Sequence, residues 1–394
     1  MGTLLIVGLV AAALACNRYP ALRGFAFTVW VFAFVAVSMV YPQAFGTWLG
    51  LDLKLLIVPL IQIIMFGMGT TLSVGDFSRV LAMPWPVVVG ILLQYTVMPF
   101  VGFGLTKIFG FEAEVAAGVV LIGSAPGGVA SNVINYLARC NVPLSVTMTA
   151  ISTLLSPVMT PLMMKLLAGQ YVEISFVRMM VDICNMILVP ILAGLVAHRI
   201  LYGKEPWLQQ ARPLAGCAAF GMVLAVAVAF TPPAWLGALK SGLLLGFALV
   251  ALVALAKLVV ELVLHGPSTW MDRVLPFVSM AGICLIIAII TARSSADLRR
   301  VGAALLAASM LHNLFGYLLG YFGARALRLN VVDARTVAVE VGMQNGGMAS
   351  GLAMNTLHSA KAALAPAIFG PWQNVSGSLL ASYWRRRPAP GQPT

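Results

Sequence analysis

The chain has few charged residues, few histidines and no long polar stretch. Of its 394 residues, 9% are charged and 61% are hydrophobic, whereas about a quarter of an average soluble domain is charged and about half is apolar. A sizeable soluble domain is therefore excluded, and the sequence predicts an all-α polytopic membrane protein. The formal net charge of +12 does not indicate a nucleic-acid partner, because the cations are dispersed at the ends of apolar segments.

Cysteine and histidine are also too scattered to build a site. The five cysteines lie in or beside apolar runs without CxxC spacing, at Cys16, Cys140, Cys184, Cys217 and Cys284. They indicate neither a disulfide framework nor a metal cluster, and we interpret them as small apolar packing residues. An intramembrane enzyme would need paired aspartates, a Ser–His arrangement or a His-rich motif within the spans, and none is visible. We therefore predict that the protein is not an enzyme.

Apolar runs between charged, proline or glycine residues predict thirteen segments: 3–16, 24–45, 54–72, 84–109, 113–138, 142–167, 175–199, 213–230, 237–264, 273–291, 301–327, 336–358 and 362–384. The first is shorter than the ~20 residues that span a bilayer upright. It can be read as a signal peptide or as a short extra membrane helix. The helix is favoured, because a basic start and a clean cleavage site are both missing.

Two of these segments are interrupted by small and polar residues. Residues 123–132 read GSAPGGVASN, and residues 340–347 read EVGMQNGG. Backbone that unwinds at membrane depth leaves amide and carbonyl groups without helical partners, so it persists only where it lines a cavity or binds something. Without 3–16, 213–230 and 237–264, the interrupted segments are the fourth and ninth of ten. This spacing predicts a ten-helix core of two inverted five-helix repeats, in which the two discontinuous helices cross.

The predicted organisation has five regions: an extra N-terminal membrane helix at 1–23, a first repeat at 24–172 with its broken helix at 113–138, a second repeat at 173–199 and 273–385 with its broken helix at 336–358, an insertion with two extra membrane helices at 200–272, and a tail at 386–394. Basic residues at the segment ends place the C-terminus in the cytoplasm. Residues 293–300, rich in arginine, are an exception, because the same alternation places them outside.

Glu340 is the strongest single candidate for a functional residue. It begins the second interruption, and an ionised carboxylate at membrane depth requires compensation, most simply by a bound cation. Gln344 and the carbonyl oxygens of Val341 and Met343 are neutral oxygen donors suited to a hard monovalent cation. The alternative is a glutamate near a membrane face that is protonated or neutralised by Arg335.

Polar residues of the other half complete a predicted cation site. Ser131 and Asn132 lie where the first broken helix restarts, while Ser145 and Thr149 are four residues apart on one face of the next helix. Such hydroxyls often bond their own backbone or assist helix packing, so their evidence comes from occurring together beside the break. Gln94 is either a further ligand or a polar contact between helices.

The helix restarts predict an anion site as well. After Gly128 and Gly347 the free amides and positive ends of the helix dipoles are directed at the crossing, where an anion can bind. A cation beside a carboxylate and an anion beside helix N-termini indicate a cation-coupled carrier of organic anions. Two alternatives stay open: a proton-coupled carrier in which Glu340 titrates, and a sensor that uses the same scaffold without transport.

The two interruptions resemble the signature motifs of the bile acid:sodium symporter family. Flanking residues match as well, namely Gly67, Met68, Gly69, Asp76, Leu144, Pro157, Pro161 and Ser376 to Ser378, and the resemblance covers residues 24–199 and 273–385. On this basis the chain is identified as a bacterial member. The resemblance implies sodium-coupled symport of a small organic anion by alternating access, in the inner (cytoplasmic) membrane; it does not predict an oligomeric state.

The resemblance also implies site residues, including two sodium sites. The first is expected to use Ser131, Asn132, Ser145, Thr149 and Glu340; the second is expected to use Gln94, Glu340, Gln344 and the carbonyls of Val341 and Met343. The substrate side is expected at Val129, Ala130, Asn345, Gly346, Gln373 and Asn374. Many members have threonine in place of Val129 and histidine in place of Gln373, so the anion is expected to be a small carboxylate, pantoate-like or bile-acid-like, with bile acid itself the weaker choice.

Overall fold

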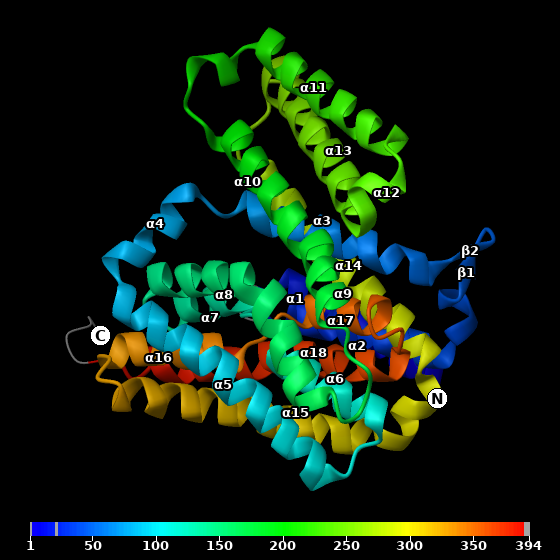
Figure 1. Cartoon of the computed structure of the whole chain (residues 1–394), viewed down its shortest axis with the longest axis vertical. Helices are drawn as coiled ribbons and strands as arrows, with labels where there is room; N and C mark the ends of the chain where they lie inside the picture. The colour runs from blue at the N-terminus through cyan, green and yellow to red at the C-terminus, as the bar shows by residue number, and fades with distance from the viewer. Residues whose placement is uncertain (1, 20–22, 390–394) are drawn as a thin grey trace. The chain divides into compact units, whose positions relative to one another are not determined.

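The computed structural model describes residues 2–19 and 23–389, and these are helical almost throughout (Figure 1). Parts of the predicted N-terminal region 1–23 and of the tail 386–394 lie outside the described residues. Among the described residues, eight helices are long and apolar enough to cross a membrane. The only strands described are β1 (Thr47–Trp48) and β2 (Leu51–Asp52), which pair antiparallel. The prediction of an all-α polytopic membrane protein is confirmed.

The chain divides into two compact units. Unit 1 is Met1–Leu55, Asp76–Met179 and Cys284–Thr394, and unit 2 is Leu56–Gly75 and Met180–Ile283. Unit 1 contains α1 (Gly2–Arg18), α2 (Arg23–Val40), α5 (Pro84–Phe109), α6 (Ala113–Ser124), α7 (Ala130–Leu137), α8 (Val142–Met163), α15 (Ser295–Ala326), α16 (Val331–Gly342), α17 (Gly346–Asn355) and α18 (Ala360–Arg385). Unit 2 contains α3 (Ile57–Thr70), α10 (Val189–Tyr202), α11 (Ala211–Phe230), α12 (Pro233–Leu236) and α13 (Lys240–Lys257). Three of the four unit boundaries fall within α4 (Val74–Ala82), α9 (Phe176–Ile183) and α14 (Met271–Arg293), and the fourth, between Leu55 and Leu56, lies just before α3.

The first predicted interruption separates α6 from α7. Ala125, which follows α6, has extended backbone with ψ 155°, as expected for the residue before a proline, here Pro126, because the proline ring excludes the helical conformation. The second interruption separates α16 from α17. The side chain of Asn345 caps α17 by accepting the N–H of Met348 at 3.0 Å, which satisfies one of the free amides at the start of that helix.

The two interruptions pair with each other. Gly127 and Gln344 form an antiparallel bridge, the N–H of Gly128 donates to the carbonyl of Met343 at 3.1 Å, and the N–H of Asn345 donates to the carbonyl of Pro126 at 2.9 Å. Backbone groups released by one break are thus satisfied by the other, as a dehydrated interior requires. The discontinuous helices meet as predicted, whereas the assignment of the remaining helices to two inverted repeats stays a prediction.

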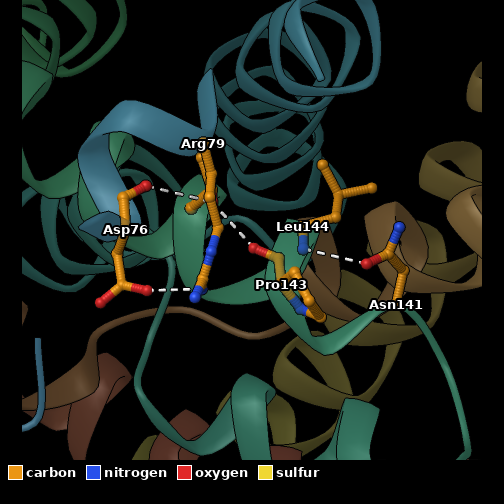
Figure 2. Close-up of polar contacts among 6 residues, drawn as sticks. Asp76, Arg79, Asn141, Pro143 and Leu144 are labelled. Atoms are coloured by element: carbon orange, nitrogen blue, oxygen red, sulfur yellow. Dashed lines mark hydrogen bonds and ion pairs between the residues drawn. The ribbon is translucent and has the colours of Figure 1, made fainter. Parts of the chain in front are cut away.

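Helices of unit 1 pack closely around this pair. Figure 1 shows α16 alongside α15. A Cβ added at Gly118 of α6 would lie only 2.1 Å from the carbonyl oxygen of Ala362 in α18, so the absence of a side chain lets these two helices approach. Figure 2 shows Asn141 capping α8, where its Oδ1 accepts the N–H of Leu144 at 3.1 Å.

Ion pairs in unit 1 account for part of the charge in residues 293–300, the exception to the predicted topology. Arg293 pairs with Asp52. Asp297 lies 3.5 Å from Nζ of Lys361, which also lies 3.2 Å from Glu112. Part of the positive charge is therefore compensated within the unit.

In unit 2, α3 and α10 form a close pair. A Cβ at Gly69 would lie 2.2 Å from the carbonyl oxygen of Ile191, and one at Gly194 would lie 2.2 Å from that of Phe66. The helices of the predicted insertion, α11 and α13, lie side by side (Figure 1). Small residues again allow the close helix contacts typical of membrane proteins.

Lys257 of α13 is 1% exposed, which is unusual for a lysine. Its Nζ donates to the carbonyls of Ile200 at 2.7 Å and Leu201 at 3.0 Å, while the carboxylate of Glu261 is 4.0 Å away. The ammonium thus satisfies carbonyl groups at the end of α10, which have no partners within their own helix.

Candidate functional site

The crossing of the broken helices surrounds Glu340 with hydroxyl groups. Glu340 is 1% exposed. Its Oε1 accepts hydrogen bonds from Ser131 at 2.6 Å and from Ser145, and its Oε2 accepts one from Thr149 at 2.8 Å. Three residues of the first predicted sodium site, from α7 and α8, therefore converge on the carboxylate of the fourth, Glu340 of α16.

Asn132, the fifth residue of that predicted site, does not contact Glu340 directly. Its Oδ1 lies 2.7 Å from Oγ of Ser145 and 3.4 Å from Oγ1 of Thr149, so each of these hydroxyls, with its single hydrogen, donates either to Asn132 or to Glu340. The hydroxyls therefore lie between two sets of acceptor oxygens, the carboxylate on one side and the amide oxygen on the other. This concentration of oxygen atoms is the chemistry that hard cations select.

The carboxylate of Glu340 has no ion-pair partner among the described residues. The alternative of neutralisation by Arg335 is not supported, because that guanidinium stacks on the ring of Trp384, with 5.4 Å between Cζ and the ring centroid. An anionic Glu340 would thus be held only by neutral donors. An ionised group buried in this way is unfavourable unless a cation compensates it.

The second predicted sodium site is held together by amide groups. Nε2 of Gln94 donates to Oε1 of Gln344 at 2.7 Å and to the carbonyl of Ala125 at 3.1 Å, and Nε2 of Gln344 donates to the carbonyl of Val341 at 2.7 Å. The carbonyl of Met343 accepts from the backbone across the break. Oε1 of Gln94 is buried and has no hydrogen-bond partner in the described residues.

The predicted substrate residues fall into two groups. Val129 is 36% exposed, and Ala130, Gly346 and Asn374 are partly buried. Gln373 and Asn345 are buried and already engaged. Gln373 accepts from the backbone N–H of Gln344 at 2.7 Å and donates to its carbonyl at 2.9 Å, so its side chain stabilises the break.

Asn135 belongs to the site, although the sequence analysis did not identify it. Its side chain is fully buried, and its Nδ2 donates to Ser145 at 2.9 Å and more weakly to Oε1 of Glu340 at 3.4 Å. The signal was available in its spacing, because Asn135 follows Ser131 by four residues and therefore shares its helix face.

Two polar residues of α15 bond backbone carbonyls of neighbouring helices, and one of these carbonyls lies at the second break. His312 contacts the carbonyl of Met98 at 2.8 Å, and Nδ2 of Asn313 donates to the carbonyl of Gly342 at 2.9 Å. Gly342 is the last residue of α16, so Asn313 satisfies a carbonyl at the break.

A cavity of about 750 Å³ lies at the starts of α8 and α16 and is lined by Cys140, Asn141, Arg325, Asn330 and Asp333, among others. Glu340 does not line this cavity.

These features define a multi-pass membrane protein with a buried polar centre at two paired, interrupted helices. The model of the sodium bile acid symporter family matches residues 58–234. The chain is 34% identical over 365 residues to the uncharacterized sodium-dependent transporter YocS of Bacillus subtilis (strain 168), with 92% of each chain covered. The protein belongs to the sodium bile acid symporter family.

Two further comparisons extend this similarity. The chain is 29% identical over 367 residues to a probable chloroplastic sodium/metabolite cotransporter, BASS1, of Oryza sativa subsp. japonica, covering 92% of this chain and 73% of the relative. Its fold is similar to that of the sodium proton antiporter MjNhaP1 from Methanocaldococcus jannaschii at pH 8, with a TM-score of 0.54 and 13% identity over 98% of this chain and 99% of the other. At that identity the likeness concerns the fold alone.

Proposed function

We propose that the protein is a secondary active transporter, and not an enzyme, that couples the symport of a small organic anion to sodium. The observation that carries the proposal is the carboxylate of Glu340, buried at a helix break and contacted only by neutral donors among the described residues. A hard monovalent cation compensates this charge. The sodium dependence in the names of two relatives agrees with it.

The first sodium ion would bind among Ser131, Asn132, Ser145, Thr149 and Glu340. In the present arrangement the hydroxyls donate toward the carboxylate or toward Asn132. A hydroxyl also has two acceptor lone pairs, so rotation of its hydrogen presents oxygen to an arriving cation without moving the backbone.

A second sodium ion would use Gln94, Glu340, Gln344 and the carbonyls of Val341 and Met343. The unpartnered Oε1 of Gln94 supports this assignment. The two ions would share the carboxylate of Glu340, which lies at the point where the breaks cross, so their occupancy would stabilise the crossing as a unit.

The organic anion would bind on the substrate side of the same crossing, at Val129, Ala130, Asn345, Gly346, Gln373 and Asn374. The start of α17, where Asn345 caps the helix, supplies backbone amides and the positive end of a dipole. Because Val129 offers no hydrogen bond and Gln373 is occupied by the backbone of Gln344, we propose a small, pantoate-like carboxylate over a bile acid.

Transport would follow alternating access in the inner (cytoplasmic) membrane, with the C-terminus in the cytoplasm. The two inverted repeats would place the crossing near the middle of the membrane. Ordering of the crossing by sodium would create the anion site, so the anion would bind tightly only when sodium is present.

Uptake into proteoliposomes tests this function. Purified protein should accumulate radiolabelled pantoate or a related small carboxylate under an inward sodium gradient, and replacement of sodium by choline should abolish uptake. Uptake driven by a pH gradient with sodium absent would instead establish a proton-coupled carrier. Binding of the anion without uptake would establish a sensor.

A further inference from the structure

Asn135 presents only one end of its amide to the cluster around Glu340. Nδ2 faces Ser145 at 2.9 Å and Glu340 at 3.4 Å. Oδ1 is buried and has no hydrogen-bond partner within the described residues. A buried amide oxygen without a donor is destabilising, so an unpartnered oxygen beside a candidate ion site calls for a functional explanation.

The other orientation of the amide is compatible with the same neighbours. A half-turn of the carboxamide would place Oδ1 close to the present position of Nδ2, facing Ser145 and Glu340. Ser145 can bond either atom, because a hydroxyl donates as well as accepts. Only the interaction with Glu340 changes sign: a bare carboxylate attracts the N–H and repels the oxygen, whereas a cation bound to that carboxylate attracts the oxygen.

We propose that Asn135 is a further sodium ligand whose carboxamide turns with occupancy. It donates Nδ2 to Glu340 when the site is empty and presents Oδ1 to sodium when the site is filled. The proposal rests on the proposed function, because it requires sodium at Glu340. It adds a sixth residue to the five predicted for the first site.

This exchange has a consequence for transport. Loss of the ion would otherwise leave an anion in a dehydrated interior, which is strongly unfavourable. A rotating amide replaces part of the lost attraction with an N–H donor, so the empty site is less destabilised. A transporter needs such an empty state for its return step. The neighbouring Asn132 is less suited to this role, because its oxygen already lies within hydrogen-bond reach of the hydroxyls of Ser145 and Thr149.

The half-saturating sodium concentration for thermal stabilisation tests the proposal. Purified protein is titrated with NaCl against choline chloride at constant total salt, as wild type, Asn135→Ala, Asn135→Asp and Ser156→Ala. Loss of one oxygen ligand in Asn135→Ala should raise the half-saturating concentration about tenfold. Asn135→Asp should lower the half-saturating concentration, because two adjacent carboxylates attract the cation more strongly than one and repel each other when the cation is absent.

Ser156→Ala is the matched control. Ser156 is buried on α8, but it donates to the carbonyl of Thr153 in its own helix, so its removal should leave the half-saturating concentration unchanged.

A purely structural Asn135 predicts lower melting temperatures for both Asn135 variants in choline chloride with unchanged sodium affinity, and that result overturns the proposal. If Asn135→Ala fails to fold, Asn135→Asp tests the proposal alone. A sodium affinity of Asn135→Asp that is unchanged or weaker than that of the wild type then overturns the proposal. Failure of the wild type to respond to sodium would refute the proposed function itself.

Discussion

Replacement of Glu340 by glutamine separates the charge of this residue from its hydrogen bonds. Oε1 accepts from Ser131, Ser145 and Asn135, whereas Oε2 accepts from Thr149 alone among the described contacts. The glutamine can therefore keep its oxygen toward the three donors and turn its NH₂ toward Thr149, whose hydroxyl can accept. Folding should be preserved, because the side-chain volume is unchanged and the contacts with Ser131, Ser145 and Asn135 are kept, while the bond to Thr149 reverses its direction.

The sodium response should nevertheless disappear. A ligand present at one hundred times its dissociation constant stabilises the folded protein by about 2.7 kcal/mol. The glutamine variant lacks the charge that attracts the ion, so this increment should fall close to zero. Glu340→Ala is a poorer test, because it removes the charge, the acceptor oxygens and the side-chain volume together, so a lost sodium response would not be specific to the charge.

Thermal unfolding in detergent, followed in NaCl and in choline chloride, measures this difference. Wild type should melt at a higher temperature in NaCl, and Glu340→Gln should melt at the same temperature in both salts. Its melting temperature in choline chloride should equal or exceed that of the wild type, since a buried charge has been removed. Sodium stabilisation that survives in Glu340→Gln would refute the assignment of the carboxylate as the ion site.

Three further substitutions test neighbouring features. Thr149→Val keeps the side-chain shape but removes the hydroxyl bonded to Glu340, and the half-saturating sodium concentration in the same titration should rise about tenfold. Gly127→Ala would place a Cβ 2.9 Å from Oε2 of Glu340, so displacement of the carboxylate should weaken sodium stabilisation. Lys257→Met removes the ammonium that satisfies two carbonyls of α10; stability in choline chloride should fall by about 1–3 kcal/mol, with the sodium response intact.

Controls of the same kind are available in the chain. Gly104→Ala adds a Cβ to a helical glycine with no heavy atom within 4 Å, so it should leave sodium stabilisation unchanged where Gly127→Ala reduces it. Equal effects of the two glycine variants would indicate a general loss of stability. An unchanged melting temperature of Lys257→Met would contradict the role of the lysine at the end of α10, and unchanged sodium affinity of Thr149→Val would remove this residue from the site.

Hydrophobic runs in the sequence predicted the membrane segments closely because their lengths are set by the bilayer. The segment predicted at 84–109 is α5 (Pro84–Phe109), and the interruption at 123–132 contains the end of α6 and the start of α7. Proline and glycine act on the backbone next to them, so the breaks could be located without tertiary information. Glu340 stood out for a similar reason, since its charge conflicts with an apolar surrounding that the sequence itself displays.

Long-range contacts were beyond the sequence. The sequence alone does not predict that Arg335 stacks on Trp384 rather than neutralising Glu340. It also does not predict that the side chain of Gln373 hydrogen-bonds the backbone of Gln344. Asn135 was overlooked because an isolated asparagine in a membrane helix has many potential partners. Only the folded chain selects Ser145 and Glu340 among them.

The sequence by itself thus determined the membrane class, the positions of the helices and the two breaks, because these depend on local composition and on residues adjacent in the chain. Tertiary structure decided how the breaks satisfy each other and which donors surround Glu340. Those outcomes require segments some 200 residues apart, such as those of Ser131 and Glu340, which are separated by 209 positions, to meet in a dehydrated interior. There each buried polar group needs a partner, and only the packing of the helices determines which partner lies within reach.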